Sequence, residues 1–320
     1  MRLLSRAVQS LLVVFVAASL AFALLHAAPG DPYSDLGDAA SMTPELQALL
    51  REQQGLDQPL AVQYRRFLGG IARGNFGYSS SQKQFVADVF RSRVPNSLLL
   101  MSLALFGSVV LGSAIGAWQG ARTGSRGDRA TVFTTLLVYS VPEFWLASVL
   151  LLVFVSTLHL LPSSGMITVE TYDTFSPMRQ LVDRLRHLVL PWLSLTLVGT
   201  AIFARFQRAS MQEAMREPFV RTARAKALAE RHVRRQAWRT ALLPIVTLTG
   251  LFFPTLLTGA VFVERVYAWP GIGSALVQAI FDRDKQLVTA CVVVGSALTA
   301  LGSLLADVAR VVVDPRLRAK

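Results

Sequence analysis

Few residues of this chain have the types and spacing that catalysis or metal binding requires. The four histidines lie far apart and match no metal-ligand spacing: His26, His159, His187 and His232. The sequence has no Gly-x-x-x-x-Gly-Lys-Ser/Thr loop for nucleotide phosphates and no suggestion of a Ser-His-Asp triad. We therefore predict a protein that is not an enzyme and that binds no cofactor or metal. If it moves a solute uphill, another subunit must supply the energy.

Ionisable residues are almost absent from the long apolar runs. An ion-coupled carrier needs such groups deep in its membrane interior, so this class of transporter is disfavoured. Glu143 and the neighbouring Phe144 are the candidates for a solute path, although a paired or water-facing carboxylate of structural use is the alternative. Asp307 lies near one end of the last apolar run. Cys291 is the only cysteine, which excludes an intrachain disulfide, and we interpret it as a small core residue.

The composition indicates a polytopic membrane protein of helices. Hydrophobic residues make up 52% of the 320 positions and charged residues only 16%, whereas soluble domains carry about 25% charged residues. A helix crosses a bilayer with about 20 apolar residues. Six segments qualify: Val8–Ala28, Ser97–Gly120, Ala130–Leu158, Leu188–Ala204, Leu242–Val263 and Leu287–Val313. The first could instead be a cleaved signal peptide, but its apolar run is longer than such peptides usually have.

The charges are distributed unequally between the two sides of this arrangement. With the N-terminus inside, the inner segments hold 19 basic and six acidic residues, and the outer segments hold 13 of each. The positive-inside rule therefore places both termini in the cytoplasm. Anionic membrane lipid is a sufficient partner for much of the excess positive charge. We predict no nucleic-acid binding, because the sequence has no zinc spacing, RNA motif or free helix-turn-helix.

These assignments divide the chain into four parts. Residues 1–28 form an N-terminal transmembrane helix, and residues 29–96 form an extracytoplasmic insertion with helix signals at Thr43-Pro44-Glu45 and a helical stripe within 58–71. Residues 97–313 form the transmembrane domain, including an inner loop at 205–240, and residues 314–320 form a cytoplasmic tail. We expect the outer segment Leu160–Arg186 to be irregular and Trp269–Gly273 to form a rigid turn at the outer interface.

Small residues recur at four-residue spacing in two of the spans. The second span carries Ser108, Gly112, Gly116 and Gly120, and the sixth carries Gly295, Thr299 and Ser303. Such stripes let a neighbouring helix backbone approach closely. They predict helix contacts and carry no functional assignment.

The inner loop at 205–240 is the strongest functional signal. It holds ten Lys and Arg residues between Arg205 and Arg239. We predict a helix over Met215–Ala229 that continues through Glu230–Arg239. Ala223, Ala227 and Leu228 would offer a small-residue face flanked by basic side chains, on which a partner could dock. The alternative is a helical hairpin held at the lipid surface by its charge.

At these residues the chain resembles the dipeptide and oligopeptide permeases of bacterial ABC transporters, specifically the first of the two permease subunits. The resemblance begins with Phe219–Leu228 and Arg239–Pro244. It extends over nearly the whole chain through a set of further motifs: Gln54–Leu60, Gly74–Ser79, Arg93–Leu98, Ser140–Leu146, Gly259–Val261, Glu264, Trp269–Gly273, Arg283-Asp284, Asp307 and Asp314–Arg316. The sequence departs from the family at Ala227, where Gly is usual, so that the turn is expected to be less sharp, and at Gln286, where Pro is usual.

The resemblance implies the type I ABC importer fold with six transmembrane helices in the bacterial inner membrane. It implies a second, homologous permease subunit, two ATP-binding subunits or domains and an extracytoplasmic solute-binding protein as partners. Contact with the ATPase is implied for the following residues: Arg221, Thr222, Ala223, Arg224, Ala225, Lys226, Ala227, Leu228 and Glu230. The family carries di- and oligopeptides, and other members handle nickel chelates or glutathione. An ion-coupled carrier and a membrane scaffold or receptor subunit stay open as other classes.

Overall fold

The computed structural model describes residues 2–27 and 58–313. The chain divides into two compact units. Unit 1 contains residues 1–95 and 271–300, and unit 2 contains residues 96–270 and 301–320. The helix signal predicted at Thr43-Pro44-Glu45 and the tail at 314–320 lie outside the described residues.

Unit 1 combines helices with one small sheet. Its elements are α1 (Arg2–Ala27), α3 (Leu60–Ala72), β1 (Tyr78–Ser79), β2 (Gln84–Phe85), the start of α4 (Val86–Ala121), α11 (Ile272–Phe281) and most of α12 (Lys285–Val313). The two strands pair antiparallel, with Tyr78 opposite Phe85. The helical stripe predicted within 58–71 is confirmed as α3. Helix α4 begins at Val86, so the last residues of the predicted insertion 29–96 are already helical.

Buried Asp284 connects two loop regions of unit 1. Its carboxylate accepts hydrogen bonds from the Ser79 hydroxyl at 2.5 Å, the Ser81 hydroxyl at 2.8 Å and the Ser81 amide at 3.1 Å. It also accepts from the amide of Leu287, one of the first-turn donors of α12 that has no partner within the helix. One acidic residue thus joins the strand region to the start of α12.

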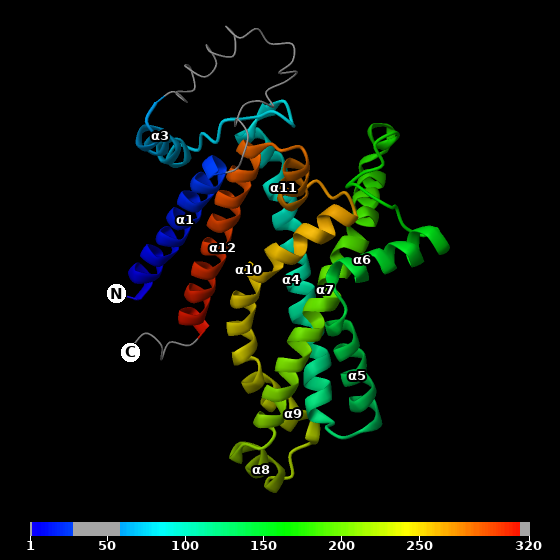
Figure 1. Cartoon of the computed structure of the whole chain (residues 1–320). Coiled ribbons are helices and arrows are strands. Elements are labelled where there is room, and N and C mark those ends of the chain that lie inside the picture. The colour runs from blue at the N-terminus through cyan, green and yellow to red at the C-terminus, as the bar shows by residue number, and fades with distance from the viewer. Residues whose placement is uncertain (1, 28–57, 314–320) are drawn as a thin grey trace. The chain divides into compact units, whose positions relative to one another are not determined.

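Unit 2 contains the remaining helices. They are the rest of α4, α5 (Arg126–Ser140), α6 (Glu143–Leu151), the π-helix η1 (Leu152–Thr157), the short 3-10 helix η2 (Tyr172–Thr174), α7 (Pro177–Ala214), α8 (Pro218–Ala225), α9 (Glu230–Ala241), α10 (Leu243–Val266) and the end of α12. Figure 1 shows α8 and α9 at the C-terminal end of α7. It also shows α6 running across the direction of α5.

The third predicted span is wrong as a single helix. The chain bends by 102° between α5 and the helical stretch that begins at Glu143. Pro142 is the N-cap of α6 with an extended backbone, and it disfavours a helical conformation for Val141, so α5 ends at Ser140. The run of 130–158 is therefore a broken span.

The fourth predicted span is too short. We expected Leu188–Ala204 to follow an irregular segment, but α7 begins at Pro177, which occupies a favoured first-turn position. Asp183 accepts two hydrogen bonds from Thr168, at 2.7 Å and 2.8 Å, and so connects the preceding loop to the first turns of α7. The irregular segment is thus confined to residues before Pro177.

Among the described residues, four helices are long and apolar enough to cross a membrane, and the bent pair makes a fifth candidate. The four lie within α1, α4, α7 and α12. Helix α10 has 24 residues, and its described apolar stretch, Leu243–Phe252, ends where the described side chains end. The six-helix count is not confirmed by these lengths.

The small-residue stripe of α4 packs closely on another helix, as predicted, and that helix is α7. A Cβ atom at Gly112 would lie 2.5 Å from the Phe203 Cβ, and one at Gly120 would lie 2.7 Å from the Met211 Cβ. Such distances leave no room for any side chain, so glycine is needed for this close approach. In α12, by contrast, a Cβ at Gly295 would meet no described atom within 4 Å.

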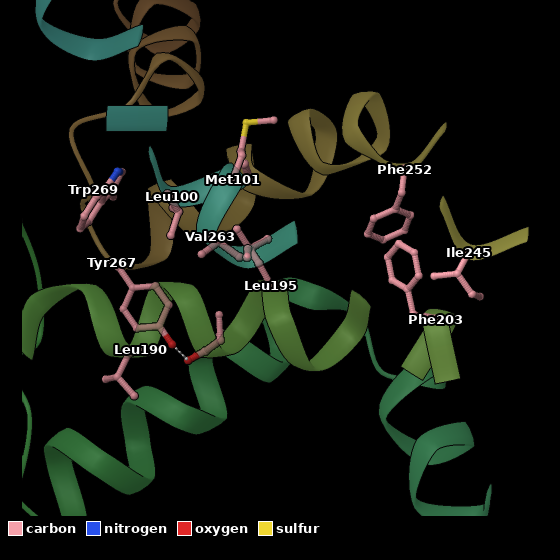
Figure 2. Packing of buried hydrophobic residues seen from close by; sticks show 13 residues of the cluster. Leu100, Met101, Leu190, Leu195, Phe203, Ile245, Phe252, Val263, Tyr267 and Trp269 are labelled. Atoms are coloured by element: carbon pink, nitrogen blue, oxygen red, sulfur yellow. Dashed lines mark hydrogen bonds between the residues drawn. The ribbon is translucent and has the colours of Figure 1, made fainter. Parts of the chain in front are cut away.

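The apolar core of unit 2 lies where α4, α6, α7 and α10 meet (Figure 2). Phe203 and Phe252 pack edge to face with ring centroids 5.2 Å apart. The Tyr267 hydroxyl donates to the Ala147 carbonyl at 2.9 Å, which is the dashed line in Figure 2. Trp269 is buried in this core and donates to the Asn96 carbonyl, so it contributes to packing within unit 2.

Candidate functional site

The candidate site is the hairpin of α8 and α9 together with the end of α7. Helix α7 ends at Ala214, and Glu217 adopts an extended backbone as the N-cap of α8. Pro218 then occupies the first turn of α8, where its missing N–H costs nothing. The single helix predicted over Met215–Ala229 is therefore wrong. The sequence Glu217-Pro218 interrupts it and starts a separate eight-residue helix.

A tight turn connects α8 to α9. Ala227 has a left-handed backbone with φ of 55°, and the Leu228 amide donates to the Ala223 carbonyl at 3.2 Å. A left-handed residue after a helix commonly closes its C-terminus in this way, and it is usually glycine. The turn is made although Ala227 carries a Cβ, so the expectation of a less sharp turn is wrong. The cost is the strain of an alanine in this conformation, about 1 kcal/mol.

The hairpin has an apolar interior of its own. Val220 and Ala223 of α8 pack against Val233 of α9, and all three are buried. Phe219 contacts this cluster and also a second one that joins α7 to α9. The second cluster consists of Met211, Ala214, Ala237 and Ala241. The hairpin is consequently packed onto the end of α7.

The structure separates the predicted contact residues into two groups. Ala223 faces the interior of the hairpin, so it does not lie on the small-residue face that we predicted. Leu228 is 49% exposed and, like Ala227, remains on the surface. The other predicted contact residues on the surface are Arg221, Thr222, Arg224, Ala225 and Lys226.

Glu230 links the two helices electrostatically. It accepts hydrogen bonds from Arg224, with Nη2–Oε1 at 2.9 Å and Nε–Oε2 at 3.3 Å, and Arg234 Nε lies 3.5 Å from Oε1. The bidentate hydrogen bond from Arg224 lowers the pKa of Glu230, outweighing partial desolvation, and the charges of Arg224 and Arg234 lower it further. Glu230 is also in the first turn of α9, where a negative charge is favoured.

A buried ion pair near the hairpin was missed by our reading of the sequence. Asp128 in α5 is 2% exposed and accepts from Arg208 Nε at 3.0 Å and Nη2 at 3.1 Å. It also accepts from the Gly124 amide at 2.9 Å. Gln212 adds a bond to the Thr123 hydroxyl. The turn between α4 and α5 is thereby fixed to α7 at the last turns before the hairpin.

The candidates for the solute path lie at the bend of the broken span. Glu143 is the first residue of α6 and is partly buried, and Phe144 is half exposed. The Phe144 ring lies 6.4 Å from that of Phe262 in α10. These two residues are neighbours at the start of α6. The side chain of Asp307 lies outside the described residues.

The described part of the chain contains no group of three or more His, Cys, Asp or Glu residues that could hold a metal ion. What the hairpin offers chemically is instead a compact basic surface on a membrane domain.

The sequence matches two families along its length. Residues 108–319 match the family described as binding-protein-dependent transport system inner membrane component, and residues 1–102 match the N-terminal part described for the same kind of component. The chain belongs to this family of transport permeases. Members of it are multi-pass membrane components of ABC importers, so the apolar helices described above are membrane helices.

Relatives of this permease are similar over almost their full length. The oligopeptide transport system permease protein AppB of Bacillus subtilis (strain 168) is 32% identical over 318 residues, which cover 98% of both chains. The di/tripeptide transport system permease protein DppB of Pseudomonas aeruginosa (strain UCBPP-PA14) is 34% identical, with 93% of both chains covered. The glutathione transport system permease protein GsiC of Escherichia coli O1:K1 / APEC is 32% identical, covering 96% of this chain and 95% of the relative.

Proposed function

We propose that this chain is a permease subunit of an ATP-driven importer of di- or oligopeptides. The observation that carries the proposal is its similarity, over nearly the full length, to permeases named for oligopeptide and di/tripeptide transport. It would have six transmembrane helices and would form half of the translocation pathway, and a second, homologous permease would form the other half. Two ATP-binding subunits or domains and an extracytoplasmic binding protein would complete the assembly.

The α8–α9 hairpin is the proposed docking element for the ATPase. Three observations support this role. The hairpin has its own apolar interior, it is packed onto the end of α7, and it leaves Arg221, Lys226 and Leu228 on its surface. A motor protein that moves such a rigid element would bias the conformations of the helices attached to it, which is what coupling between two sites requires.

The proposal places the hairpin and both termini in the cytoplasm. The sided charge distribution of the sequence supports this orientation. It can be tested with Lys226→Cys, because Lys226 is exposed and the only native cysteine, Cys291, is buried. A membrane-impermeant maleimide should label this variant in inverted vesicles and not in intact cells. Labelling from outside intact cells would contradict the orientation.

Docking can be tested by placing a charge on the exposed apolar residue of the turn. We expect Leu228→Asp to reduce copurification of the ATPase and peptide uptake by the assembled transporter. Val169→Asp is the control, because Val169 is an apolar residue that is 81% exposed in the loop preceding α7. Unchanged copurification and uptake with Leu228→Asp would refute the assignment of the hairpin.

Substrate class needs a separate measurement. The glutathione permease is about as similar to this chain as the oligopeptide permease, at 32% identity each. Uptake of labelled peptides should therefore be measured in competition with glutathione in the assembled transporter. Preference for glutathione over di- and oligopeptides would replace peptides as the proposed substrate and would leave the permease role intact.

A further inference from the structure

One face of α9 carries basic residues that the fold does not use. Arg231, Arg235 and Arg239 follow each other at four-residue spacing and are all exposed. Residues at this spacing lie on one face of a helix. Among the ion pairs of the described residues, none involves these three arginines, and the nearby Glu230 is paired with Arg224 and Arg234.

The opposite face of α9 is the one that packs. Val233, Ala237 and Ala241 also recur at four-residue spacing and are buried. At 100° per residue, Val233 lies about 200° around the helix from Arg231. The helix therefore has one face that fixes it to the rest of unit 2 and one basic face that is turned away from that interior.

The basic face also carries an aromatic residue. Trp238 is seven positions after Arg231, so it returns to nearly the same angle on the helix, and it is 38% exposed. Tryptophan beside arginine is typical of helices at a membrane–water interface, where the ring enters the headgroup region and the cation stays hydrated.

The chain position of α9 brings the C-terminal end of this face close to the start of α10. Helix α9 ends at Ala241, and the apolar helix α10 begins at Leu243, which is 53% exposed. A single residue separates this basic amphipathic helix from the apolar helix α10. Arg239 and Trp238 are consequently within about 8 Å of Leu243 along the chain direction, and Arg235 and Arg231 are about 12 Å and 18 Å from it.

We propose that the basic face of α9, formed by Arg231, Arg235, Trp238 and Arg239, binds the headgroup phosphates of anionic phospholipids. Guanidinium groups bind phosphate oxygens in pairs, and positive charges close to an anionic leaflet are attracted to it. In the orientation of the proposed function this leaflet is the inner one. The hairpin then has two binding surfaces: α8 and the turn for a protein, and the outward face of α9 for lipid.

The test uses the purified full-length chain in nanodiscs, without ATPase, binding protein or peptide. Its fluorescence is measured with brominated phosphatidylglycerol or with brominated phosphatidylcholine at the same mole fraction. The Trp238→Phe variant isolates the contribution of this tryptophan from the other four. We expect phosphatidylglycerol to quench Trp238 more strongly than phosphatidylcholine. The triple variant Arg231→Gln/Arg235→Gln/Arg239→Gln should lose this preference.

A matched control removes three exposed arginines elsewhere. The variant Arg65→Gln/Arg66→Gln/Arg73→Gln changes the net charge equally but lies in and just after α3. It should keep the lipid preference of the parent. For each arginine removed from α9, we expect the affinity for phosphatidylglycerol relative to phosphatidylcholine to fall roughly fivefold, because each basic residue is attracted to an anionic surface.

Three results would overturn the lipid site. They are equal quenching of the parent by both lipids, a preference that survives the triple variant at α9, and loss of ATPase copurification by that variant in lipid-free detergent. The last result would assign the face to a protein partner. The quenching experiment contains no transport partner, and its result does not depend on which leaflet the hairpin faces. The lipid site can therefore fail while the proposed permease function stands, and the permease function can fail while the lipid site stands.

Discussion

Replacing Gly112 with alanine tests the packing of α4 on α7. The added Cβ would lie 2.5 Å from the Phe203 Cβ and 2.9 Å from the Thr200 carbonyl oxygen. Neither atom can rotate away, because one is attached directly to the α7 backbone and the other is part of it. Ordinary contact begins at 3.4 Å, so the two helices must separate locally by about 1 Å.

The expected cost of Gly112→Ala follows from that displacement. Phe203 is buried and packs edge to face on Phe252, so a shift of α7 also disturbs the core. Overpacking of this kind destabilises proteins by about 1–3 kcal/mol. Each kcal/mol corresponds to a fall in melting temperature of about 2–4 °C for a large domain. We therefore expect the melting temperature of the chain in detergent, measured by tryptophan fluorescence, to decrease by several degrees.

Gly295→Ala is the matched control. It is the same substitution in another membrane helix, so the gain in helix propensity is similar, but the new methyl group would meet no described atom within 4 Å. Its melting temperature should stay close to that of the parent. Equal changes for the two variants would refute the packing argument, since the difference between them isolates the contact with α7.

Three further predictions concern buried or paired groups. Asp128→Asn should lower the melting temperature by an amount equivalent to about 3 kcal/mol, because it leaves the Arg208 cation without its counter-ion. A melting temperature equal to that of the parent would show that the ion pair is dispensable. Glu230 has a lowered pKa in the folded hairpin, so the stabilisation it provides is present above its ordinary value of 4.5 and is lost as the pH falls through the lowered value. Amide hydrogen exchange of α8 and α9, corrected for intrinsic rates, should accelerate in that acidic range in the parent and not in Glu230→Gln, whose Arg224 contact no longer titrates. Cys291 is buried, so it should resist maleimide in the folded chain and react after denaturation; rapid labelling of the native protein would contradict its burial.

The membrane character and the close helix contact of α4, although not its partner α7, could be predicted from the sequence because they depend on local patterns. Apolar runs, sided charge and glycines at four-residue spacing each report directly on the environment of a helix. The broken span had a local signal too, in Val141-Pro142, but a long apolar run concealed it. The same applies to Ser176-Pro177, where the polar residues that follow made the first turns of α7 resemble a loop.

Other features depend on contacts between distant parts of the chain. Asp128 and Arg208 are separated by 80 positions, and nothing near either residue indicates the other. The inward position of Ala223 depends on how a short helix packs on Val233, which composition does not determine. For this reason the sequence indicated a basic helical segment in this region but did not give the bounds of its helices or separate its surface from its interior.

The junction of α9 and α10 has a mechanical consequence. Only Leu242 lies between them, and it keeps a helical backbone, so the chain has no flexible joint at this point. The clusters around Val220 and Met211 fill the space between α7, α8 and α9. A force applied to α8 would therefore turn α10 as well, and the transmission of movement into the bilayer would depend on side-chain volume at these two clusters rather than on the length of a linker.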